Sequence, residues 1–369
     1  MKNNLKKIAL ISLLSLLSNN SAFADNKYTA VDEFSKDKFS IEADKYLKNS
    51  KLTNLDLNFN EKDLLVVLQN TKEYYQKHGD EDPVVKREGI LSSVGVSLKN
   101  ILETIDFMID SLQEDIKYNK PIRLKDHDFI NKNFKVIRWL PYNAPDKNQK
   151  EQIRITKYAI FTHQGSKTKN NIFNIPLYSI KSLDTYFLKK YSKQDILSGI
   201  YEKGGKEFGK VEPMVYLTRE GLEEALMEGT ILINFPDKTS KMYNVDKNNG
   251  VAYIKGLNPK QQKRYWYFKQ VDNINGYGNK IENRIKIKPG VTFAGDVFNI
   301  GIGRIVALEY SVSGEKKIKL GIIGDTGGAF LPNLFQLDYL AGIYKTKQDF
   351  INKSKSLPPY VNVYFLIKK

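Results

Sequence analysis

The chain has 369 residues and a formal net charge of +16, from 58 lysines and arginines against 42 aspartates and glutamates. It contains no cysteine, which excludes disulfides, zinc–thiolate sites and cysteine nucleophiles. Its three histidines, His78, His127 and His163, are scattered and none has a second histidine at ligand spacing. We therefore expect no metal site and no cofactor.

The first 24 residues have the composition of a secretory signal. Three lysines within the first seven residues precede the apolar run Ile8–Leu17, and the segment ends in Ala22-Phe23-Ala24. A basic start, a short apolar stretch and an A-x-A site are the three parts of a cleavable signal peptide. The apolar run is too short for a permanent membrane span, and no other stretch of the sequence is apolar enough. We expect residues 1–24 to be removed and the mature protein to be soluble, periplasmic and associated with the cell wall.

Loss of the three signal lysines would leave a formal charge of +13. Excess positive charge attracts anionic polymers through a field that salt screens. An exported protein rarely meets nucleic acid, so we expect no nucleic-acid partner. The cell wall, with the carboxylates of its peptide stems, is the nearer polyanion.

The N-terminal third is predicted to be helical after a polar start. Residues 25–60 show no clear period and are interpreted as a loosely ordered leader. Residues 61–77 and 86–116 have helical patterns, and apolar residues in the second recur at spacings of three and four. We interpret that stripe as a packing face.

After Lys120 the pattern changes to short runs rich in β-branched and aromatic residues, separated by turn clusters, which is typical of strands. Short helices are expected at 194–199 and 218–227. No fixed-period repeat is present, and the length suits two domains. The expected strands are 134–140, 152–161, 172–180, 230–235, 264–271, 284–288, 291–298, 304–311, 316–323 and 361–367.

Two aspartates near the C-terminus are the candidate catalytic residues. Asp325 ends a predicted strand and is followed by Gly327 and Gly328, which permit a tight turn or a close backbone approach. Asp338 lies among apolar residues, which can raise the pKa of a carboxyl group so that it holds a proton near neutral pH. A general acid needs that property. From the sequence alone, each aspartate could equally be an ordinary turn or strand residue.

These segments resemble the membrane-bound lytic transglycosylase A family, which has a three-aspartate double-psi barrel. Asp325–Ala329 is similar to the family's Asp-x-Gly-Gly-Ala turn, and Asp338 with Gly342 to the Asp-x-[Tyr/Phe]-x-x-Gly element that follows. The order of several weak motifs upstream is also similar. These are Ile155-Thr156-x-Tyr158, Phe173–Tyr178, Asp195–Gly199, Glu228-Gly229-Thr230, Asn249-Gly250-x-Ala252-Tyr253, Asn258-Pro259, Tyr265–Phe268 and Lys288–Val291.

The resemblance spans roughly residues 60–369 and has departures. Asn283 stands where the family has its first aspartate, Glu228 where it has Gln, and Leu331-Pro332-Asn333 where it has Lys-Gly. The resemblance implies a mainly β fold with N-terminal helices (α+β), and a double-psi β-barrel with a second β-rich domain inserted. The barrel domain would comprise residues 61–161 and 268–369, and the inserted domain residues 162–267. A groove would lie between them.

The implied activity is that of a lytic transglycosylase on peptidoglycan glycan strands, with a 1,6-anhydro product and no metal or cofactor. The resemblance makes Asp338 the single acid and base, with Asp325 as the second choice for that role and otherwise a partner that shapes the barrel or forms hydrogen bonds. The substrate-binding residues would be Tyr158, Glu228, Thr230, Asn249 and Tyr253. We expect the protein to be a monomer.

The three aromatic residues Tyr265, Trp266 and Tyr267 would stack on sugar rings or alternate in burial along a strand. A non-catalytic peptidoglycan-binding relative and a hydrolytic glycosidase or expansin-like protein on the same barrel remain alternatives.

Overall fold

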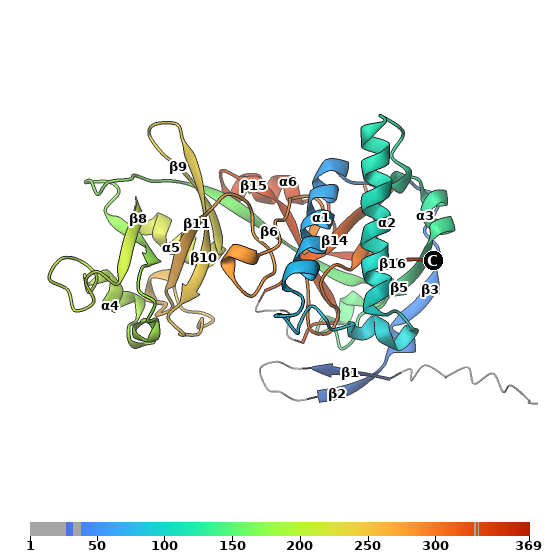
Figure 1. Cartoon of the computed structure of the whole chain (residues 1–369), viewed down its shortest axis with the longest axis horizontal. Coiled ribbons are helices and arrows are strands. Elements are labelled where there is room, and N and C mark those ends of the chain that lie inside the picture. Colours follow the sequence, from blue (N-terminus) through green and yellow to red (C-terminus); the bar gives the residue numbers. More distant parts are fainter. Residues whose placement is uncertain (1–26, 32–37, 328–329, 331) are drawn as a thin grey trace, which may run out of the picture.

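The computed structural model describes residues 27–31, 38–327, 330 and 332–369 (Figure 1). The predicted signal peptide lies outside the described residues, as do Gly328 and Ala329 of the glycine turn. Among the residues that are described, no helix combines the length and the apolar character that a membrane crossing requires.

Three α-helices follow the first four strands, and the described chain after residue 133 consists mainly of strands with short helices between them. The helices are α1 (Glu61–His78), α2 (Leu98–Lys117), α3 (His127–Asn133), α4 (Lys193–Leu197), α5 (Arg219–Glu228) and α6 (Lys347–Ser354). The strands are β1 (Lys27–Val31), β2 (Lys38–Glu42), β3 (Leu47–Ser50), β4 (Leu57–Asn58), β5 (Phe134–Trp139), β6 (Ile153–Gln164), β7 (Ile175–Ile180), β8 (Val211–Leu217), β9 (Thr230–Asn234), β10 (Ser240–Asn248), β11 (Trp266–Val271), β12 (Thr292–Ala294), β13 (Ile305–Val312), β14 (Glu315–Asp325), β15 (Gln336–Tyr344) and β16 (Tyr360–Lys368).

Six strands close into a barrel. In spatial order they are β6, β15, β12, β14, β13 and β16, and β16 pairs back with β6. The β6–β15 and β12–β14 pairs are parallel and the others antiparallel. Closure leaves no free edge and fills the interior with side chains. The predicted mainly β fold, with a barrel and N-terminal helices, is therefore confirmed.

The helices α1 and α2 pack together on the barrel, against β14 and β16 (Figure 1). The first begins at Asn60, whose side chain accepts from the backbone N–H of Asp63. The second begins at Ser97, which forms a capping box with Asn100. The predicted single helix 86–116 is therefore wrong in its first part. Gly95 there has φ +77°, a left-handed conformation that ends the 3₁₀ turn before α2.

Residues 25–60 are more ordered than the sequence indicates. β3 pairs with β5 and β4 pairs with β14, so both strands join the barrel sheet. β1 and β2 form a hairpin that buries Ala30 and Ile41. The prediction that this segment is loosely ordered is thus wrong for its described part. Strands of two to five residues bury too few side chains to produce a visible period.

A second β-rich unit lies beyond the barrel. β6 runs on past it and pairs in parallel with β9, which continues into β10 and β11 (Figure 1). The hairpin β7–β8 and helix α5 complete this unit, which has its own hydrophobic cluster between Leu177 and Phe268. The predicted two-domain architecture with an inserted β-rich domain is confirmed. Residues 162–267 remain our proposed bounds for it.

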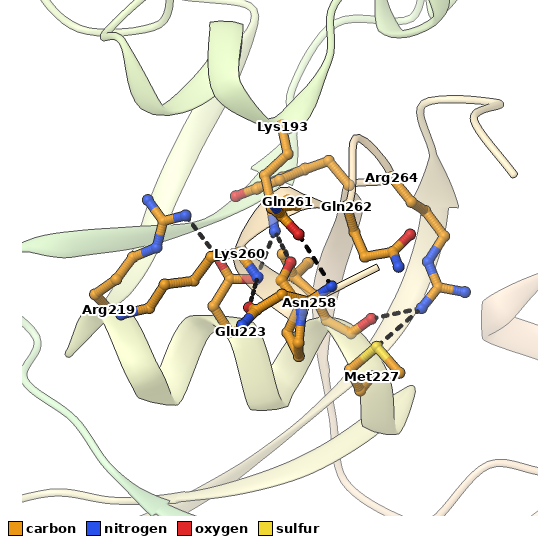
Figure 2. Close-up of polar contacts among 12 residues, drawn as sticks. Lys193, Arg219, Glu223, Met227, Asn258, Lys260, Gln261, Gln262 and Arg264 are labelled. Carbon is orange, nitrogen blue, oxygen red and sulfur yellow. Dashed lines mark hydrogen bonds and ion pairs between the residues drawn. The ribbon is translucent and has the colours of Figure 1, made fainter. Parts of the chain in front are cut away.

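The inserted domain contains a buried ion pair (Figure 2). The Lys193 ammonium donates to Glu223 Oε2 at 2.5 Å and to the Pro259 carbonyl at 2.6 Å. Arg219 Nη2 donates to Glu223 Oε1 at 2.6 Å. Lys193 is only 1% exposed, so these contacts must compensate its lost hydration. They tie α4, α5 and the 258–262 segment together.

Candidate active site

The two candidate aspartates lie on strands that flank the same short strand. Asp325 is the last residue of β14 and Asp338 the third of β15, and both pair with Ala294 of β12. On its other side, Asp338 pairs with Thr156 of β6. The barrel therefore places both carboxyl groups in one row across its wall, although they are separated by a loop in the sequence.

Asp325 is held by neutral donors. Tyr158 Oη donates to Asp325 Oδ2 at 2.7 Å, and the backbone N–H of Thr326 donates to Oδ1 at 2.8 Å. Burial raises the pKa of Asp325 to about 6, while these two hydrogen bonds and the positive charge of Arg284 act in the opposite direction. Tyr158 thus orients Asp325 directly.

Asp338 has a less satisfied environment. Burial raises its pKa to about 7; the nearby charge of Asp325 adds to this effect, whereas the Thr156 hydroxyl opposes it. Its Oδ1 is buried and has no hydrogen-bond partner among the described residues. Both carboxyl groups therefore hold a proton at higher pH than an exposed aspartate does. A carboxyl group that keeps its proton near neutral pH can act as a general acid.

A cavity of about 360 Å³ lies between the barrel and the inserted domain. Its barrel side is formed by Tyr158, Asp325, Thr326, Arg284 and the 274–278 loop, and its opposite wall by residues 228–230 and 244–245. The structure thus brings four predicted site residues to one cavity: Tyr158, Asp325, Glu228 and Thr230. Asp338 is not among the residues that line the cavity; it lies across β12 from Asp325, near enough for the charge of Asp325 to act on it.

The structure does not bring the other two predicted binding residues to this cavity. Asn249 is 1% exposed; its Nδ2 donates to the carbonyls of Tyr191 and Lys263, and its Oδ1 accepts from the backbone N–H of Tyr265. These contacts hold loops of the inserted domain. Tyr253 is 43% exposed and lies outside the cavity, with the Arg264 guanidinium 5.2 Å from its ring centroid.

The prediction that Tyr265, Trp266 and Tyr267 all stack on sugar rings is wrong. Tyr265 and Tyr267 are fully buried in the inserted domain, where the Tyr267 hydroxyl lies 2.6 Å from that of Tyr201. Trp266 points to the other face of β11 and is half-buried, with Arg264 at 4.0 Å from its ring centroid. Burial of Tyr265, Tyr267 and Phe268 in the core of the inserted domain explains most of this run of aromatic residues.

Two neighbours of the cavity were missed from the sequence. His163 Nε2 lies 2.9 Å from Glu228 Oε2, and Glu224 lies 3.5 Å from His163 Nδ1. Burial raises the pKa of Glu228, and His163 opposes that effect. Glu228 follows His163 by 65 positions, so no local pattern could indicate the pair.

The second missed residue is Arg284. The sequence assigns it to a predicted strand, 284–288, that does not form.

Asn283, one of the departures from the family, does not line the cavity, and its Nδ2 lies 3.3 Å from His78 Nδ1 at the end of α1. Among the described residues, no group of three or more histidine, cysteine, aspartate or glutamate side chains is placed to hold a metal ion.

Neither a protein-family model nor a curated protein matches the chain. Solved structures do. MltA of Escherichia coli with bound chitohexaose superposes with a TM-score of 0.59 at 13% identity, over 88% of this chain and 94% of that one. A membrane-bound lytic murein transglycosylase from Agrobacterium tumefaciens gives 0.58 at 13% identity, over 88% and 98%. This chain has the MltA fold. MltA from Neisseria gonorrhoeae gives 0.51 at 13% identity, over 83% and 87%. The resemblance seen in the sequence motifs is thus confirmed at the level of the fold, and the inserted domain agrees with the MltA architecture.

Proposed function

We propose that the protein is a lytic transglycosylase. It would cleave the β-1,4 bond between N-acetylmuramic acid and N-acetylglucosamine in peptidoglycan and leave a 1,6-anhydro-muramic end. The observation that carries the proposal is a pair of carboxyl groups at the interdomain cavity of the MltA fold: Asp325 lines the cavity, and Asp338, whose pKa burial raises to about 7, lies across β12 from it. A bound chitohexaose in one MltA structure supports a glycan as the ligand.

One general acid suffices for this reaction. Glycosidases that use water or a covalent intermediate need two carboxyl groups in defined roles. Here protonated Asp338 would give its proton to the leaving glycosidic oxygen as the C1–O bond breaks. The C6 hydroxyl oxygen of the same muramic acid would bond to C1, and its proton would return to Asp338. Because this nucleophile is intramolecular, its effective concentration is very high and no water is consumed.

The surrounding residues would orient the acid and the glycan. Asp325, fixed by Tyr158, places a negative charge beside Asp338 and so favours its protonated form. Glu228 and Thr230 on the opposite wall would contact sugar hydroxyl or acetamido groups. For Asn249 we propose an indirect role through the loops that it holds, and for Tyr253 a contact with an outer sugar.

We also propose export of the chain, cleavage after Ala24 and action in the periplasm as a monomer. N-terminal sequencing of the exported protein would test the processing. A retained apolar segment would contradict it.

The function is tested by incubating residues 25–369 with purified sacculi and analysing the products by mass spectrometry, with and without a chelator. We expect muropeptides that end in 1,6-anhydro-N-acetylmuramic acid, formed equally well with the chelator present. Reducing-end products would instead identify a hydrolase. Binding to sacculi without any product would identify a non-catalytic relative. Asp338→Asn protein serves as the matched control for contaminating activity.

A further inference from the structure

The loop Gly276-Tyr277-Gly278 makes two close backbone approaches in the cavity. A Cβ on Gly276 would lie 2.4 Å from the carbonyl oxygen of Gly324, the residue before Asp325. A Cβ on Gly278 would lie 2.7 Å from Cα and 2.9 Å from Cγ of Arg284. Both positions therefore require glycine. The backbone N–H of Tyr277 donates to the Gly324 carbonyl at 3.0 Å, so the loop is fixed between the strand of Asp325 and Arg284.

Arg284 bridges from this loop to the inserted domain. Its Nη1 donates to the Val245 carbonyl at 3.1 Å and to Asn244 Oδ1, both on β10. Asn244 Nδ2 in turn donates to Thr230 Oγ1 on β9. A single guanidinium thus connects the barrel side of the cavity to the wall that carries Thr230.

The guanidinium is also the positive charge that acts on Asp325. The titratable groups near Asp325 are Tyr158 on β6, Asp338 on β15 and Arg284, of which Arg284 alone is a cation. Glu228 shares the cavity on the opposite wall. Asp246 on β10 and Glu282 act on Arg284 from the side of the inserted domain and the preceding turn. The nearby cation favours the ionised form of Asp325 against the effect of burial.

We propose that Arg284 is a positioning residue for the acid–base centre. It fixes the Thr230 wall to the barrel through β10, and it places a positive charge in the cavity that Asp325 lines. The catalytic part of this inference rests on the proposed transglycosylase function, whereas the charge relation between Arg284 and the two carboxyl groups does not.

The test compares Arg284→Met and Arg284→Lys with the wild type in two assays. The first follows the carboxyl carbons of Asp325 and Asp338 by NMR during a pH titration and needs no activity. We expect the pKa of Asp325 to rise in Arg284→Met and to stay near the wild-type value in Arg284→Lys. The second measures the pH profile of turnover on sacculi. We expect turnover to fall about tenfold in Arg284→Met and the acidic limb of its pH profile to move to higher pH. In Arg284→Lys, the acidic limb should return to its wild-type position.

Arg138 offers a matched control. It is also half-buried, and its Nη2 donates to the Asn362 side-chain oxygen at 2.8 Å and to the Glu151 carbonyl at 3.3 Å; none of these three residues lines the cavity. Arg138→Met should leave both carboxyl titrations and the pH profile unchanged.

A lower melting temperature in Arg284→Met with unchanged titrations of both carboxyl groups would overturn the proposal, because the residue would then be merely structural. If wild-type protein forms no product from sacculi, the proposed function fails, and the NMR titration alone still decides the relation between Arg284 and Asp325.

Discussion

Replacing Asp338 with asparagine should make the protein less active and, at alkaline pH, more stable. Asparagine has nearly the same shape but cannot donate an acidic proton, so general acid help disappears and turnover on sacculi should fall about a hundredfold or more. The same change removes a carboxyl group that is ionised at pH 8 in surroundings that disfavour its charge.

The stability gain follows from the pKa of Asp338. Its rise from 3.8 to about 7 means that the folded state holds this proton more tightly than the unfolded state. The free energy of unfolding therefore falls as pH rises between about 4 and 7, and the full penalty remains at pH 8. Three pKa units correspond to about 4 kcal/mol. Because the side chain is partly exposed, solvent screening reduces this, and we expect about 2 kcal/mol.

Urea unfolding of wild type and Asp338→Asn at pH 4.5 and pH 8 measures the effect. The variant should be more stable by about 2 kcal/mol at pH 8 and nearly equal to the wild type at pH 4.5. Asp272→Asn, which removes an exposed carboxyl group, is the control and should show no such difference. A stability difference independent of pH would refute the reasoning about Asp338. Near-normal turnover would refute its role as the acid.

Three further variants test neighbouring features. Tyr158→Phe removes the hydroxyl that donates to Asp325, so turnover should fall about tenfold and its acidic limb should move to higher pH, while an unchanged pH profile would contradict the contact. Glu223→Ala leaves Lys193 buried without its carboxylate and should cost about 3–5 kcal/mol by urea unfolding, whereas Glu220→Ala, whose ion pair is exposed, should change the stability much less. Asn249→Ala should cost about 1–3 kcal/mol and leave turnover of the folded enzyme unchanged; a rise in KM without loss of stability would instead make Asn249 a direct substrate contact.

The sequence predicts those parts of the fold in which local pattern and burial agree. β13, β14 and β16 are buried along most of their length, and their apolar runs mark them clearly. β10 was missed because it is polar and half-exposed, and β15 because the aspartate within it breaks the apolar run. Local propensity could not indicate that 284–288 forms only an isolated β-bridge, between Lys286 and Asn275, since its position is set by contacts with the 274–278 loop and β10.

Among the site residues, too, the sequence indicates only those that have a local signal. Asp325 and Asp338 could be selected because each has a local signal, a glycine turn or apolar neighbours. Arg284 and His163 have no local signal, because their partners are 40 and 65 positions away. Asn249 lies in a recognisable motif, but the motif contributes three hydrogen bonds to backbone groups of the inserted domain.

The continuity of β6 through both domains restricts how such a protein can change in length. The strand carries Tyr158 within the barrel and His163 where it pairs with β9. Side chains alternate between faces, so one residue inserted between Ala159 and Phe161 would turn every later side chain of the strand to the opposite face. His163 would then point away from Glu228, while Tyr158 kept its contact with Asp325. Insertions or deletions within β6 should therefore be tolerated only when they add or remove two residues at a time. Insertions of a single residue should be found in the loops of the inserted domain.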